Sequence, residues 1–125
     1  MTRNLITIIL ALLLAFLFIW WTSYLDRVVG DMTGYTGAIY EAAMDGDNEE
    51  AMNLARRLNE YWDNESATMH ALVDHTLVES VKTLIDDCLM LAYTESDELP
   101  MKAMELDKRM KHIKDSEYIS FANIF

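Results

Sequence analysis

Residues that constrain the backbone or bind metals are scarce in this chain of 125 residues, which has one cysteine, one proline and four glycines. A lone cysteine excludes an internal disulfide, and no cluster of cysteine and histidine with zinc-site spacing is present. The scarcity of proline and glycine, with few β-branched runs, favours helices. We expect Cys88 to be a small buried hydrophobic residue.

Positive charge is also scarce. The chain has 10 lysines and arginines against 21 aspartates and glutamates, so its formal net charge is −11. This balance argues against nucleic acid as a partner, because nucleic-acid binding depends on basic side chains that neutralise phosphates. It argues equally against adhesion to anionic lipid head groups.

Charge is absent altogether between Arg3 and Asp26, where the sequence includes LITIILALLLAFLFIWW. A helix needs about 20 mostly apolar residues to cross the hydrocarbon core of a bilayer. Trp20 and Trp21 end the run, as expected of rings that prefer the membrane interface. We therefore predict a single-pass transmembrane anchor over residues 1–25 and a helical body over residues 26–125.

Two alternatives to a permanent anchor stay open, a cleaved signal peptide and a buried helix of a soluble protein. A lipoprotein signal is excluded because no cysteine follows the apolar run. The short basic flank with Arg3 favours a cytoplasmic N-terminus, which places the body outside the cytoplasm, at the cell membrane.

The body shows apolar residues at steps of three and four, which predicts helices over residues 26–44, 48–62, 66–93 and 98–118. Gly46 suits the left-handed position after a helix, and Asp47 suits the cap of the next one. The fold class is therefore all-α, an anchor followed by a small antiparallel bundle of about four helices, with two stacked helical hairpins as the variant.

Several residues are candidates for contact with a partner. Gly30 and Gly34 share one helix face and form either a flexible joint or a close-packing surface for another helix. The terminal sequence SFANIF is apolar and either folds back on the bundle or docks on a partner. The candidate interaction residues are Gly30, Gly34, Trp20, Trp21, Phe121, Ile124 and Phe125.

We find no motif for catalysis, a cofactor or a metal. His75 and Glu79 are four residues apart and are candidates for an ion pair or for pH sensing. On one continuous helix His70 and His75 would point about 140° apart, so they are not expected to share a metal ion. We expect Met101, Met104 and Met110 to fill the core, with an adaptable binding groove as the alternative.

The body carries Ala51, Leu54, Leu58 and Trp62, followed by His75 and Glu79, and it ends with His112-Ile113-x-Asp115-x-Glu117 and Asn123-Ile124-Phe125. This arrangement resembles a known family. That family comprises short, single-span, membrane-anchored helical proteins of unknown function from spore-forming Gram-positive bacteria. The resemblance covers nearly the whole chain and implies a cell-envelope protein with no catalytic residues to transfer.

These observations predict a non-enzymatic interaction module whose single span lies in the lipid bilayer and which partners another membrane protein. A homo-oligomer is compatible with the same features. The alternative is an extracytoplasmic sensory bundle that binds a small ligand.

Overall fold

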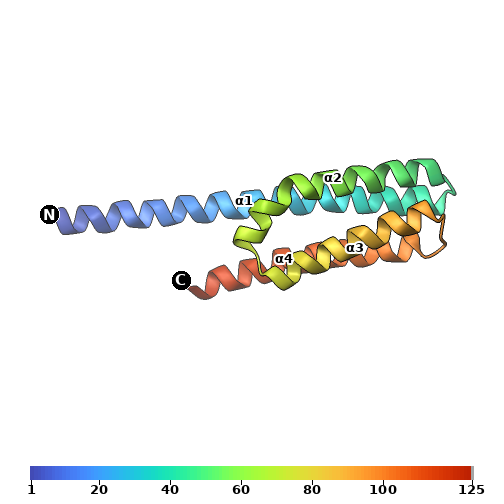
Figure 1. Ribbon diagram of the computed structural model, residues 1–125. Helices are drawn as coiled ribbons and strands as arrows, with labels where there is room; N and C mark the ends of the chain where they lie inside the picture. The colour runs from blue at the N-terminus through green and yellow to red at the C-terminus, as the bar shows by residue number, and fades with distance from the viewer. Residues whose placement is uncertain (125) are drawn as a thin grey trace.

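The computed structural model describes residues 1–124, with side chains described through residue 117, and this part of the chain forms four helices joined by short turns. They are α1 (Thr2–Met44), α2 (Asn48–Leu72), α3 (His75–Tyr93) and α4 (Leu99–Ile124). The predicted all-α fold is confirmed. α1 combines the predicted anchor with the first helix of the body, so no break separates the two (Figure 1).

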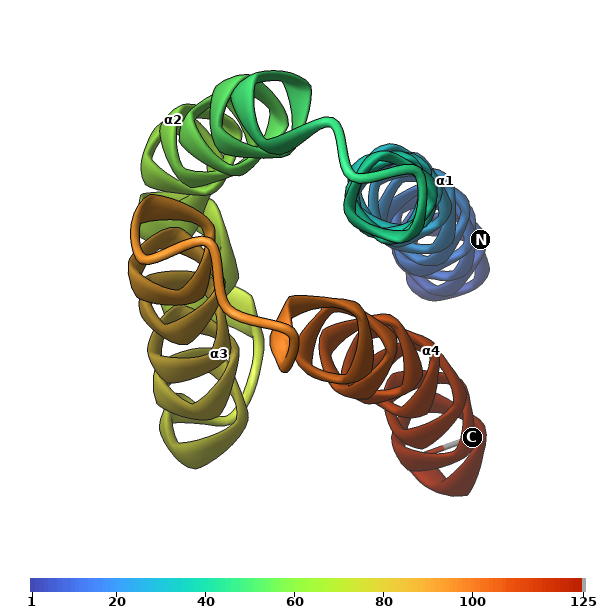
Figure 2. The same cartoon turned by 90° about the vertical axis from the view of Figure 1, so that its right-hand side faces the viewer.

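The helices form an antiparallel bundle in which each helix packs against two others. α1 lies against α2 and α4, and α3 lies against the same two helices, as the view along the bundle shows (Figure 2). The first half of α1 projects from one end of this bundle, which we call the near end. The α2–α3 connection lies at the near end, and the other two connections lie at the opposite, far end (Figure 1).

The turn between α1 and α2 follows the local chemistry expected of its residues. Gly46 has a φ of 75°, a left-handed conformation that glycine adopts without strain. The Asp47 side chain accepts a hydrogen bond of 3.1 Å from the Glu50 backbone N–H and so caps α2. At the start of α4, Pro100 occupies the first turn, where it removes no intrahelical hydrogen bond.

The predicted boundary between the second and third helices is wrong. Residues 63–66 are helical, and α2 continues to Leu72, whereas the chain breaks at Val73 and Asp74. Val73 is extended, with φ −114° and ψ 152°, and the Asp74 carboxylate accepts a 2.7 Å hydrogen bond from the Thr76 N–H to cap α3. We call this two-residue break the elbow.

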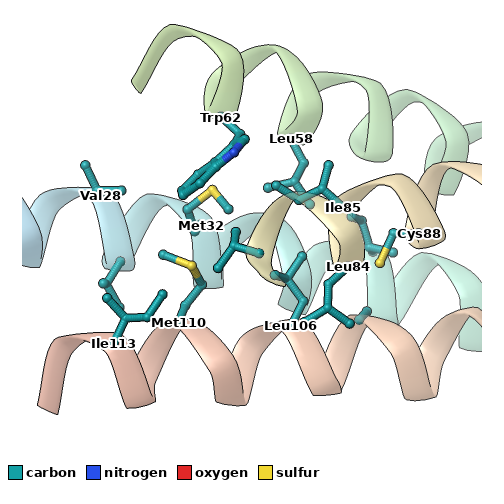
Figure 3. Close-up of a cluster of buried hydrophobic side chains, with 14 of the residues drawn as sticks. Val28, Met32, Leu58, Trp62, Leu84, Ile85, Cys88, Leu106, Met110 and Ile113 are labelled. Atoms are coloured by element: carbon teal, nitrogen blue, oxygen red, sulfur yellow. The ribbon is translucent and has the colours of Figure 1, made fainter. Parts of the chain in front are cut away.

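The core of the bundle is apolar and draws on all four helices (Figure 3). Trp62 of α2 is its largest fully buried side chain, and Met32, Ile85 and Met110 come from the other three helices. Burying such side chains contributes about 1.5–3 kcal/mol each relative to exposure. Cys88 is also fully buried, as predicted.

One polar contact crosses this core between α1 and α4. The Thr36 hydroxyl donates a 2.9 Å hydrogen bond to Oδ1 of Asp107, and both residues are buried. The other carboxylate oxygen of Asp107 lies 2.8 Å from Nζ of Lys111, one turn further along α4. Asp107 is therefore satisfied on both oxygens, which is the condition under which a buried carboxylate is tolerated.

We predict that Thr36→Val lowers the free energy of unfolding by about 1.5–3 kcal/mol, because the buried carboxylate loses a hydrogen-bond donor with almost no change in shape. Denaturation of the full chain in detergent, followed by circular dichroism, measures this loss. Thr83→Val is the matched control, because the Thr83 hydroxyl is exposed and donates to its own helix, at Glu79 O. Equal losses in the two variants would contradict the assigned role of the Thr36–Asp107 contact.

Candidate functional site

The apolar half of α1, residues 2–20, lies outside the bundle. An 18-residue window of this helix has a mean hydropathy of 2.6 and is only 6% buried, so it is long and apolar enough to cross a membrane by length and composition. Exposure changes abruptly at its end, because the Trp20 side chain is 46% exposed and Trp21 is 8% exposed. Trp21 is thus part of the bundle core rather than a free surface.

Tyr24 occupies the next turn of α1 and joins this boundary to α2. Its ring stacks on Trp20 and Trp21, with centroids 5.8 and 5.9 Å away. Its hydroxyl donates a 2.7 Å hydrogen bond to Oε2 of Glu65. Arg27 lies over the Tyr24 ring, 5.3 Å from its centroid, and 3.7 Å from Oε1 of the same glutamate.

Two further polar contacts fix α1 to its neighbours near the same boundary. The Tyr61 hydroxyl of α2 donates a 2.7 Å hydrogen bond to Asp31, and Lys114 of α4 lies 3.0 Å from Oδ1 of Asp26. Burial, with a smaller contribution from Asp31, raises the pKa of Tyr61, so this hydroxyl stays a donor at physiological pH. Sequence analysis missed these contacts, because they join residues that are far apart in the chain.

The two candidate glycines lie on a continuous stretch of helix, so the structure favours no joint at this point. A Cβ atom added to Gly30 or Gly34 would meet nothing within 4 Å, and both residues are exposed. They line an open groove of about 530 Å³ between α1 and α2 that is also lined by Tyr35 and Tyr61. The glycines therefore serve no close packing within the bundle and leave this face of α1 accessible.

The histidines are placed differently from the prediction. Because the helix breaks at the elbow, His70 and His75 do not diverge, and their ring centroids lie 5.3 Å apart. His75 lies 3.7 Å from Glu79, as predicted, and His70 lies 3.9 Å from the same Oε1 atom. The prediction that the two rings could not share a ligand assumed one continuous helix, and that assumption is wrong.

Asp74, four residues after His70, caps α3 and lies close to the C-terminal half of α4. Burial, with a smaller contribution from the Asp74 carboxylate, raises the pKa of Glu117 on that helix. The elbow therefore lies in acidic surroundings at the near end of the bundle. The third histidine, His112, is exposed on α4 and contacts the half-buried Ser116 at 3.4 Å.

The methionines are divided between core and surface. Met110 is fully buried, as predicted, whereas Met101 and Met104 are exposed, so the core interpretation is wrong for these two. They line an open groove of about 840 Å³ at the far end, together with Tyr40 and Met44 of α1. The alternative that the sequence allowed, an adaptable binding groove, stays a prediction for this surface.

The lone cysteine offers no nucleophile. Burial raises the pKa of the Cys88 thiol to about 12, so the reactive thiolate is scarce at physiological pH.

The remaining candidates from the sequence lie at the C-terminus. Phe121 and Ile124 are part of α4, but the structure describes only their backbone. Phe125 lies outside the described residues.

We predict that Gly34→Ala raises the free energy of unfolding by about 0.5–1 kcal/mol, because alanine favours a helix interior and its methyl group meets no neighbour. Denaturation of the full chain in detergent measures the gain. Gly46→Ala is the control, and it should destabilise, because the φ of 75° strains any side chain. A loss of stability in Gly34→Ala would contradict an open glycine face.

The model of a family described as a domain of unknown function, DUF4363, matches residues 19–124. No curated protein and no solved structure matches the chain. The matched segment begins at the end of the apolar half of α1 and includes the whole bundle. The predicted resemblance to a family of unknown function is thereby confirmed, and the chain belongs to the DUF4363 family.

Proposed function

We propose that this protein is an extracytoplasmic four-helix module, anchored in the cell membrane by the first half of α1, which acts by binding another membrane protein rather than by catalysis. The observation that carries the proposal is the continuity of α1. One helix has a first half exposed on all sides and a second half that supplies one wall of the bundle core.

The exposure of residues 2–20 supports the interpretation of this segment as a membrane anchor rather than as the core helix of a soluble protein. A core helix of a soluble protein is mostly buried, whereas this window is 6% buried. Large apolar side chains exposed around a whole helix are stable in lipid, where apolar surface needs no cover from water. The exposed Trp20 ends the apolar half, where the interface of a membrane would fall.

The same helix supports retention of the anchor over its removal as a signal peptide. The small-residue stretch that could serve as a late cleavage site is Val28-Val29-Gly30, which lies inside the bundle, and both valines are buried. Cleavage there would remove Trp21, Tyr24 and Leu25 from the core as well. Losing several large side chains at about 2–5 kcal/mol each exceeds the stability of an ordinary small domain.

Partner binding is supported by where the accessible features lie. Cys88 is buried and protonated, and the His112–Ser116 contact lies on the exposed surface of α4. The grooves at Gly34 and at Met101 are both open to solvent. The groove at Gly34 continues the line of the anchor, so a helix of a partner packed along the anchor would reach it.

The proposed orientation predicts a specific labelling pattern for single cysteines. Met101→Cys, at the exposed far end, should react with a membrane-impermeant maleimide in intact cells, whereas Thr2→Cys should react only after the cells are permeabilised. Native Cys88 is the internal control and should stay unlabelled, because it is fully buried and its pKa is raised to about 12. The reverse pattern would overturn the orientation, and a mature chain without residues 1–30 by mass spectrometry would overturn the anchor.

The partner proposal predicts that a specific membrane protein co-purifies with the tagged full chain in mild detergent. Gly34→Leu should abolish this recovery, because the new side chain fills the open groove without disturbing the fold. Arg56→Leu is the matched control on an exposed position of α2 and should leave the recovery unchanged. Recovery of nothing above background, or only of a second, differently tagged copy of this chain, would contradict the proposal.

A further inference from the structure

The elbow between α2 and α3 brings together three side chains that bind metals in other proteins. His70 comes from the last turn of α2, His75 is the first residue of α3, and Glu79 lies one turn later. One ligand atom from each lies within 4.8 Å of the other two. All three side chains are exposed, so an ion and its water have free access.

The distances fit a metal ion better than a set of direct hydrogen bonds. Oε1 of Glu79 lies 3.7 Å from Nε2 of His75 and 3.9 Å from Nε2 of His70, both longer than the 2.7–3.2 Å of a hydrogen bond. Metal–ligand distances of 2.0–2.2 Å in a tetrahedral site correspond to about 3.3 Å between ligand atoms. The two separations between Glu79 and the histidines exceed this value by a few tenths of an ångström, and all three ligand atoms lie within 4.8 Å of one another, so side-chain rotations would close the site around an ion.

The donor set also selects the class of ion. Two imidazole nitrogens and one carboxylate oxygen suit Zn²⁺ and neighbouring divalent transition metals, whereas Mg²⁺ and Ca²⁺ prefer oxygen ligands alone. The formal net charge of −11 also raises the local concentration of cations. A fourth position remains open for water, as in other sites with three protein ligands.

We propose that His70, His75 and Glu79 bind one divalent transition-metal ion, with Zn²⁺ as the best match, and that the ion cross-links α2 to α3 across the elbow. The ion fixes the relative position of the two helices at the near end of the bundle, where the chain has only Val73 and Asp74 between them. The site is independent of the proposed partner, and it gives the ligand-binding alternative from the sequence a specific chemical class of ligand.

The test is calorimetric titration of ZnCl₂ into the full chain, purified in detergent with a histidine-free tag. We expect saturable binding of one ion per chain. His75→Gln and Glu79→Gln should each weaken the affinity by more than tenfold, since even outer-shell partners of a metal are worth about 10–100-fold. Circular dichroism should show unchanged helicity in both variants, because the altered side chains are exposed.

His112→Gln is the matched control, because it removes a histidine of α4 that lies outside the cluster, and its affinity for Zn²⁺ should be unchanged. Substitution with Co²⁺ gives a second readout, since a tetrahedral site produces strong visible absorption that both cluster variants should lose. An excess of MgCl₂ should not displace the ion. The proposal is overturned if Zn²⁺ does not bind, if the cluster variants bind it as the native chain does, or if Mg²⁺ competes for the site.

Discussion

The continuity of α1 is the constraint on which the rest of the structure depends. Its 43 residues make a rod of about 65 Å, because an α-helix rises 1.5 Å per residue. About 30 Å of that length is the apolar half, which matches the hydrocarbon thickness of a bilayer. The remaining 35 Å or so equals the length of α2, which has 25 residues, so the second half of α1 sets the height of the whole bundle. A bend between the halves would separate the core from the apolar segment, and the stacking of Trp20 on Tyr24, whose hydroxyl is held by Glu65, acts against it.

The two halves of α1 differ in pattern, and this made the fold class predictable from the sequence. An all-round apolar helix and a helix with a single apolar stripe have different partners, lipid in the proposed arrangement and protein in the bundle. The local capping chemistry of Gly46 and Asp47 was equally predictable, since it depends on a few neighbouring residues. The start of α4 near Pro100 follows the same logic.

The elbow was not predictable by the same means, for a physical reason. The apolar residues Met69, Val73, Leu77 and Val81 continue at four-residue steps through the break, so hydrophobic periodicity predicts one helix where the structure has two.

The sequence from Asp63 to Ser66 resembles a turn by composition, yet it stays helical. Glu65 must face α1 to accept the hydrogen bond from the Tyr24 hydroxyl. Helical geometry places Glu65 on that side together with the buried Trp62, three residues earlier. Asp74 was the available signal, as a good N-cap residue directly before His75. The convergence of His70 and His75 depended wholly on that boundary.

The distribution of features between the two ends of the bundle has a mechanical consequence. At the near end, α1 is joined to α2 through Glu65 and Tyr61 and to α4 through Lys114, and the elbow lies at the same end. A partner that shifts or rotates the apolar half of α1 must therefore move both neighbouring helices, because a packed core responds by concerted shifts rather than by continuous deformation. The side chain of Met101 at the far end is coupled to that motion only through the length of the bundle. In the proposed arrangement, the elbow is thus the one connection placed where events at the membrane act on it directly, and its two-residue length makes its conformation sensitive to the relative positions of α2 and α3.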